Sequence, residues 1–125
     1  MGTNYYLATS KKEAREKYLR NYTLTDEPAW AYEIHIAKDS IGWIPLFQAH
    51  DGAFNSYKEL RALVETGDFI LYDGSHHLLS WQEFDSIIQS KMDLKEDLQS
   101  HLGRNSVIPY YKDLEGYEFT HGEFS

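Results

Sequence analysis

The sequence predicts a single α+β domain, in which a small antiparallel sheet of about five to seven strands carries about three helices. The 125 residues are enough for one domain with one hydrophobic core. Short runs of alternating polarity follow one another across tight turns, as in antiparallel hairpins. Serine-led helix starts, each with a glutamate three residues later, separate these runs.

The first third of the chain predicts a strand, a helix and a hairpin. Residues 4–8 alternate in polarity and predict the first strand. Ser10 with Glu13 matches a capping box, so we expect a helix from about residue 11 to residue 22. Residues 32–37 and 43–48 alternate on either side of the turn-like segment 38–42, which predicts the hairpin.

The rest of the chain predicts further helices and strands in alternation. Ser56 with Glu59 and Ser80 with Glu83 repeat the capping box. They predict helices over about residues 57–65 and from residue 81 either to a break near residue 93 or to residue 101. Residues 69–72 and 75–79 flank an Asp-Gly turn signal, and residues 107–111 and 117–119 predict a last pair of strands. Lys91 interrupts the apolar stripe of the last helix.

The composition excludes several classes of function. With 12 Lys and Arg against 20 Asp and Glu, the formal charge is −8, which argues against direct nucleic-acid binding. Without cysteine there is no disulfide framework and no thiolate metal site. No apolar run is long enough for a membrane span, and the first residues do not resemble a secretion signal. We therefore expect a cytoplasmic protein with no cofactor and no membrane partner; a homo-oligomer stays open.

A first candidate site lies in the predicted hairpin, where His35, Lys38, Ser40 and Trp43 fall within nine positions. An imidazole, an ammonium group and loop amides would together bind an anion. In the alternative interpretation, His35 and Ser40 only stabilise the hairpin while Lys38 is solvated.

The remaining histidines give weaker signals. His76 and His77 are adjacent, so in a strand they would point to opposite faces and would not share a metal ion. No metal site is therefore predicted there. We expect the other histidines, His50, His101 and His121, to be surface residues.

A second candidate site is the acidic and aromatic C-terminal segment. Carboxylates that flank aromatic rings can imitate a phosphate backbone or meet a basic groove on a partner. In the alternative interpretation, the segment is an acidic strand edge that resists aggregation. The predicted partner-binding residues are Tyr110, Tyr111, Asp113, Glu115, Tyr117, Glu118 and Phe124.

Three segments together resemble an uncharacterised family of small bacteriophage proteins. They are the start Met-Gly-Thr-Asn-Tyr-Tyr, the central pattern His-x-x-Lys-x-Ser-x-Gly-Trp and the ending Gly-Tyr-Glu-Phe with Gly-Glu-Phe-Ser. Many relatives carry a Cys-x-x-Cys pair before the histidine-containing strand, but this chain has no cysteine. The resemblance therefore implies phage origin and expression in the bacterial cytoplasm, without the zinc site.

These observations lead to two principal hypotheses of function. The first is a non-catalytic phage protein that binds and inhibits a bacterial host protein, such as a defence nuclease, through the acidic-aromatic segment. The alternative is a nucleotide or small-molecule binder, or a hydrolase, with a pocket around His35, Lys38 and Trp43. No phosphate loop, nucleophile elbow or His-Glu-x-x-His pattern favours an enzyme. A structural protein of the virion is a third hypothesis.

Overall fold

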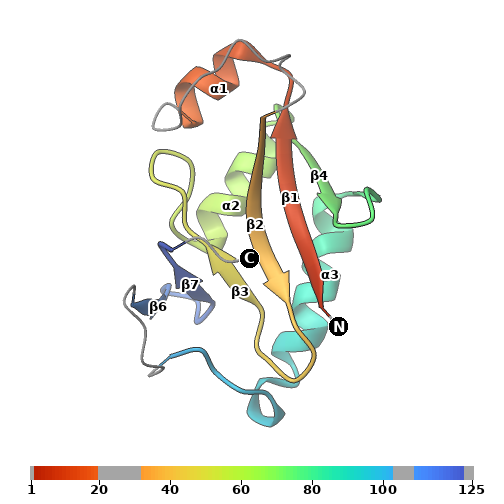
Figure 1. Ribbon diagram of the computed structural model, residues 1–125, viewed down its shortest axis with the longest axis vertical. Helices are drawn as coiled ribbons and strands as arrows, with labels where there is room; N and C mark the ends of the chain where they lie inside the picture. The colour runs from red at the N-terminus through yellow and green to blue at the C-terminus, as the bar shows by residue number, and fades with distance from the viewer. Residues whose placement is uncertain (1, 20–31, 103–108, 123–125) are drawn as a thin grey trace.

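The computed structural model describes residues 2–19, 32–102 and 109–122 (Figure 1). Strands and helices alternate along these ranges much as the sequence predicts. The elements are β1 (Thr3–Thr9), α1 (Lys12–Tyr18), β2 (Tyr32–Asp39), β3 (Leu46–Gln48), α2 (Tyr57–Glu65), β4 (Ile70–Asp73), β5 (Leu78–Leu79), α3 (Trp81–Met92), the 3₁₀ helix η2 (Lys95–Asp97), β6 (Tyr110–Lys112) and β7 (Glu118–Thr120).

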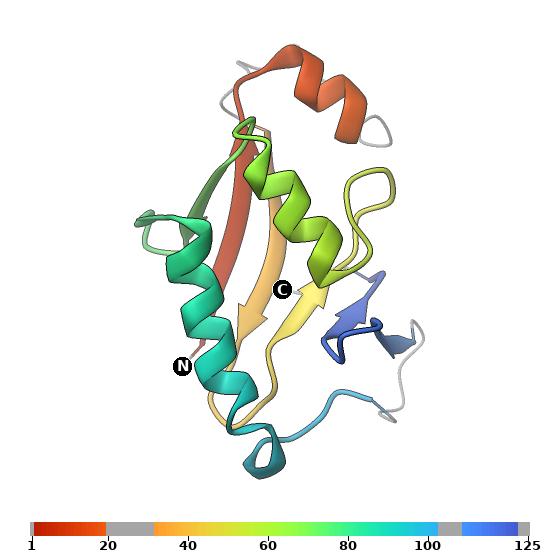
Figure 2. The ribbon, with the colours of Figure 1, turned by 180° about the vertical axis from the view of Figure 1, so that it is seen from behind.

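The seven strands form one sheet in the order β5-β4-β1-β2-β3-β7-β6. Helices α2 and α3 cover one face of this sheet, while α1 lies beyond its end (Figure 2). The α+β prediction is confirmed. The sheet is mixed rather than purely antiparallel, because β3 and β7 run parallel. Three strands (β4, β5 and β6), the helices α2 and α3 and the 3₁₀ helix η2 separate them in the chain, and such long connections allow parallel pairing.

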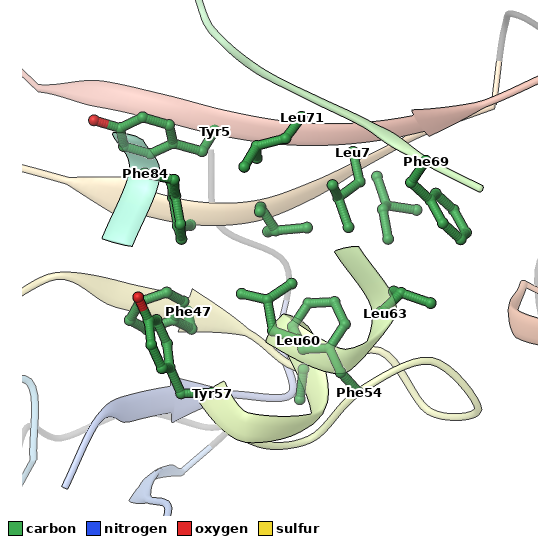
Figure 3. Close-up of a cluster of buried hydrophobic side chains, with 14 of the residues drawn as sticks. Tyr5, Leu7, Phe47, Phe54, Tyr57, Leu60, Leu63, Phe69, Leu71 and Phe84 are labelled. Carbon is green, nitrogen blue, oxygen red and sulfur yellow. The ribbon is translucent and has the colours of Figure 1, made fainter. Parts of the chain in front are cut away.

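The core lies between the sheet and the two helices that cover it (Figure 3). Phe47, on β3, is fully buried and stacks on Phe119 of β7 with ring centroids 5.2 Å apart. Tyr57 and Phe84 pack against the same ring from the helical side in T-shaped contacts, with ring centroids 5.4 Å and 6.4 Å away. Edge-to-face and offset contacts of this kind are favoured by aromatic quadrupoles. Phe47 therefore joins both helices to the sheet.

An irregularity in β2 decides what the uncovered face presents. Tyr5 pairs with Ala37 and Tyr6 with His35, so Ile36 is an extra residue between the two pairs. A bulge of this kind resets the alternation of side chains. His35 and Lys38, three residues apart, consequently share the face of the sheet that α2 and α3 leave open.

The capping box predicted at Ser80 is confirmed in full, and that at Ser56 is confirmed in its serine half alone. The Ser56 and Ser80 hydroxyls each accept the amide of the glutamate three residues later, at 3.1 Å. Helix α3 ends at Met92, so the break near residue 93 is the correct alternative. Among the described residues, no helix is both long and apolar enough to cross a membrane.

The capping box predicted at Ser10 is wrong. Helix α1 begins after Lys11, which makes no side-chain cap. The hydroxyl of Thr9 accepts the Lys11 amide at 3.1 Å and donates to the Asp68 carbonyl at 2.6 Å. The end of β1 thus supplies the bond that Ser10 was expected to make. The predicted extension of this helix to residues 20–22 lies outside the described residues.

The second strand of the predicted hairpin is shorter than expected. It begins at Leu46 rather than at Trp43. The Ile44 amide donates to the Gln99 carbonyl at 3.0 Å, and the Gln99 amide donates to the Gly42 carbonyl at 2.9 Å. The segment around Trp43 therefore pairs with the loop after η2 instead of with β2.

Lys91, which interrupts the apolar stripe of α3, forms an ion pair with the end of β2. Its Nζ lies 3.2 Å from Asp39 Oδ1, and the two side chains are only 23% and 14% exposed. Lys91→Ala would leave a poorly solvated carboxylate, so we expect a loss of about 1–2 kcal/mol in the free energy of unfolding. Urea unfolding measures this loss; an equal loss in the exposed control Lys95→Ala would contradict it.

Candidate binding cleft

A cleft of about 680 Å³ lies between α2, α3 and the turn that joins β6 to β7. Three residues of the predicted acidic-aromatic segment reach it: Asp113, Glu115 and Tyr117. The helices supply its other walls. The full lining is Ser56, Tyr57, Lys58, Arg61, Trp81, Asp85, Gln89, Asp113, Leu114, Glu115 and Tyr117.

Stacked aromatic rings form one wall of the cleft. Tyr57, the first residue of α2, lies flat on Tyr117 with centroids 3.9 Å apart and planes at 14°. Trp81, the first residue of α3, is tilted against Tyr57 at 5.1 Å and is half-buried. Both helices begin at this wall, so their starting positions set its shape.

Hydrogen bonds fix the polar ends of these rings. The Tyr57 hydroxyl donates to Asp85 Oδ1 at 2.6 Å. Gln89, one turn further along α3, donates from Nε2 to the same oxygen at 3.1 Å and to the Tyr117 hydroxyl at 2.5 Å. The stacked pair and the two α3 side chains thus form a closed network, which holds the cleft in one geometry.

The chemistry of this network is unsuited to nucleophilic catalysis. Burial, followed by the hydrogen bond to Asp85, raises the pKa of Tyr57. Burial also raises the pKa of Tyr117. Both hydroxyls therefore stay protonated near neutral pH, whereas an activated phenol needs a lowered pKa. Within the described ranges, no group of three or more His, Asp or Glu side chains is placed to hold a metal ion.

The buried tyrosines predict a loss of stability in alkali. Burial is the first cause of a raised pKa for Tyr5 and Tyr111, each to about 12, and for Tyr57, Tyr72 and Tyr117. The unfolded chain releases these protons near pH 10, before the folded one does. Their stabilisation is therefore complete well below about pH 10, and the part due to Tyr5 and Tyr111 is lost as the pH rises from about 10 to about 12.

Two measurements check this expectation. The free energy of unfolding in urea should fall between about pH 10 and about pH 12. Tyrosinate absorbance of the folded protein should show a class of tyrosines that ionises above the ordinary range. Uniform titration of all ten tyrosines near pH 10 would contradict the buried arrangement.

Asp113 holds the cleft together rather than presenting a free carboxylate. Its Oδ1 accepts the amides of Glu115 and Tyr117 at 3.0 Å and 2.9 Å, and its Oδ2 accepts the Tyr57 amide at 2.8 Å. The carboxylate therefore fixes the β6–β7 turn and satisfies the first amide of α2, where negative charge is favourable. The side chains that protrude from this turn are Leu114, which is fully exposed, and Glu115.

The structure removes Glu118 from the predicted contact surface. Its side chain is fully buried, and it accepts hydrogen bonds from Ser100 Oγ at 2.5 Å and from the His101 amide at 2.7 Å. Tyr111 donates its hydroxyl to the Asn55 carbonyl at 2.8 Å, outside the cleft lining. Tyr110 lies against His101 at 5.8 Å. Phe124 lies outside the described residues.

His35 is one ring of a stack that crosses the open face of the sheet. Its ring stacks on that of Tyr6 with centroids 4.7 Å apart. Tyr6 stacks in turn on Tyr72 at a centroid distance of 5.7 Å, and Tyr72 stacks on His76 at 5.9 Å. The Nε2 of His35 is 3.1 Å from the Ala37 carbonyl. These contacts stabilise the sheet across β2, β1 and β4.

The remaining hairpin residues have other partners. Trp43 stacks on His101 at 4.9 Å, so its ring and that of His35 belong to separate stacks. The Ser40 carbonyl accepts the Trp43 amide at 3.1 Å and Lys91 Nζ at 3.4 Å. His101 is buried, contrary to the surface position that the sequence suggested.

His50 is buried as well, so the surface prediction for this residue is also wrong. Its Nε2 lies 2.8 Å from the His35 carbonyl, and its backbone pairs with Phe54. A short loop thus folds back under β2 and uses the imidazole to satisfy a strand carbonyl.

Sequence reasoning missed the helical half of the cleft. Trp81 fits the apolar stripe of α3, so its pattern predicts a core residue. Asp85 and Gln89 stand at i and i+4 on the polar side of that helix, where the sequence predicts only solvent. Their spacing was the available signal, but only the packed turn from β6 to β7 shows what faces them.

Comparison of the chain with protein-family models, with curated protein sequences and with solved structures found no match.

Proposed function

We propose that this chain is a non-catalytic bacteriophage accessory protein, which binds and inhibits a bacterial host protein through the cleft between α2, α3 and the β6–β7 turn. The observation that carries the proposal is the convergence of Trp81, Tyr117 and Glu115 on one cleft. Tryptophan and tyrosine are the side chains most enriched at the energetic centres of protein interfaces.

Two further features support binding over catalysis. The cleft hydroxyls are protonated; that of Tyr57 donates to Asp85 and that of Tyr117 accepts from Gln89, so they supply neither a base nor a nucleophile. Leu114 projects fully exposed from the rim. An exposed leucine beside aromatic rings gives a partner apolar area to bury.

The net charge and the sequence resemblance indicate the kind of partner. A charge of −8 speeds association with a basic protein surface. The resemblance to small phage proteins supports expression in a bacterial cytoplasm, where proteins that handle nucleic acid, including defence nucleases, expose such surfaces. Inhibition would follow if the bound chain covers a surface that DNA or RNA needs.

Affinity capture from a bacterial lysate tests the proposal with two matched variants. The cleft variant is Leu114→Asp with Trp81→Ala, and the control is Lys12→Glu with Glu16→Lys on exposed α1, which keeps the net charge. Wild type and control should retain the same host protein. The cleft variant, still folded by circular dichroism, should lose it by at least about tenfold.

A functional readout accompanies the capture. Expression of the wild-type chain should weaken the protection that a host defence system gives against phage, and the cleft variant should not. Equal retention of every host protein by wild type and cleft variant would rule out this cleft as the binding site.

A further inference from the structure

A second cleft extends the first along α3. It has a volume of about 370 Å³ and shares three lining residues with the first cleft: Gln89, Glu115 and Tyr117. Beyond them it reaches the end of α3 and η2. The shared lining makes the two clefts one groove, with α3 as one side and the β6–β7 turn as the other.

Carboxylates recur along the α3 side of this groove at helical spacing. Asp85 and Asp93 both line it and are eight residues apart, with Gln89 midway. At 1.5 Å per residue, the two carboxylates are about 12 Å apart along the helix. The turn adds Glu115 opposite them. A ligand that follows the groove therefore meets negative charge at both ends.

The cations that line the groove only partly offset this charge. Arg61 is engaged by Glu65, with Nε 2.5 Å from Oε1. Lys58 and Lys95 lie at opposite ends of the lining. Against them stand Asp85, Asp93, Glu96 and Glu115, and the groove is consequently acidic overall.

The aromatic wall supplies an independent preference for cations. Trp81 is half-buried and lines the first cleft beside Asp85. Indole is the ring that attracts cations most strongly. Asp85 uses Oδ1 for Tyr57 and Gln89, and its Oδ2 accepts no hydrogen bond from the described residues. A planar guanidinium fits between an indole face and a carboxylate oxygen.

We propose that this groove holds a basic segment of the partner protein, with an arginine between Trp81 and Asp85 and a second cation about 12 Å further on at Asp93 and Glu115. The inference rests on the proposed function and names the chemistry of the partner. In an extended segment, side chains four residues apart are separated by about 13 Å, so two arginines with three residues between them match the carboxylates.

Purified protein and a synthetic peptide test this directly. The probe is a fluorescent, otherwise neutral peptide with two arginines separated by three residues, and a second peptide of the same composition has the arginines adjacent. Fluorescence anisotropy should show about fivefold to tenfold tighter binding of the spaced peptide, with affinity falling as salt is added.

Charge-matched variants localise the binding. Asp93→Asn with Glu115→Gln should weaken binding of the spaced peptide about tenfold, whereas Glu13→Gln with Glu16→Gln on α1, the same change in net charge, should alter it less than twofold. All four carboxylates are exposed, so both variants should fold. Titration should also shift the NMR resonance of the Trp81 indole and leave that of Trp43 in place.

The outcomes separate this inference from the proposed function. Equal weakening by the two charge variants, or equal binding of the two peptides, would overturn the inference even if capture of a host protein still depends on Trp81 and Leu114. If capture of the host protein does not depend on Trp81 and Leu114, the proposed function is wrong. Binding of the spaced peptide that is weakened only by the Asp93 and Glu115 variant would still support the site for a basic segment.

Discussion

Replacing Glu118 with alanine is expected to lower the free energy of unfolding by about 3 kcal/mol. The carboxylate is fully buried, and it accepts hydrogen bonds from Ser100 Oγ and the His101 amide. Without it, both donors lose this acceptor, and the His101 amide is left unpaired in a buried position. The loop that carries them also supports Trp43, through the stack on His101.

Two companion variants make this expectation specific. Glu118→Gln keeps the volume and one acceptor oxygen, so we expect a loss of only about 1 kcal/mol. Glu115→Ala removes an exposed carboxylate three residues away and should change stability by less than about 0.5 kcal/mol. Urea unfolding compares the three, and near-ultraviolet circular dichroism should report the loosened Trp43 in Glu118→Ala alone. Equal losses of stability in Glu118→Ala and Glu115→Ala would contradict the stabilising role of the buried Glu118 carboxylate.

The contrast between Glu115 and Glu118 shows what a sequence pattern cannot decide. Both are acidic residues beside aromatic ones in the same short segment. Strand alternation puts Glu118 and Phe119 on opposite faces, but that alone predicts a solvated carboxylate. The loop at Ser100 and His101 covers this part of the open face, and that contact comes from a segment 17 residues away in the chain.

Structure that depends on neighbouring residues was predicted better than structure that depends on contacts between distant parts of the chain. The starts of α2 and α3 depend on a serine and a glutamate three residues apart, and both were predictable because those contacts lie within one turn. The same pattern failed at Ser10, where Thr9 already satisfied the Lys11 amide from the end of a strand. Capping motifs compete with neighbouring strand ends, which the pattern does not record.

The sheet shows the same difference between local and long-range prediction. Alternating runs predicted the strands and the hairpin turns, since both depend on neighbouring residues. The parallel pairing of β3 with β7 joins Phe47 to Phe119 across most of the chain. The candidate cleft requires that pairing, because it carries the β6–β7 turn to the starts of α2 and α3. The sequence therefore pointed to aromatic residues in the candidate site, but it did not predict that residues from α2, α3 and the β6–β7 turn pack together there.

Replacing Asp113 with alanine is expected to cost about 2–3 kcal/mol of folding free energy and to remove partner binding with it. Its carboxylate accepts three backbone amides, two in the β6–β7 turn and one at the first residue of α2. Without these bonds the turn is no longer held against the helix start, and the rim formed by Leu114 and Glu115 loses its position beside Trp81.

Asp113→Asn separates the two ends of this bridge. The amide oxygen can still accept the turn amides of Glu115 and Tyr117, but the NH₂ group would face the Tyr57 amide, donor against donor. We therefore expect about 1 kcal/mol of destabilisation. Partner binding, measured where the variant is fully folded, should be weakened less than in Asp113→Ala. If either variant keeps full stability yet loses binding, Asp113 contacts the partner directly, as the sequence alone predicted, and its role as a bridge is wrong.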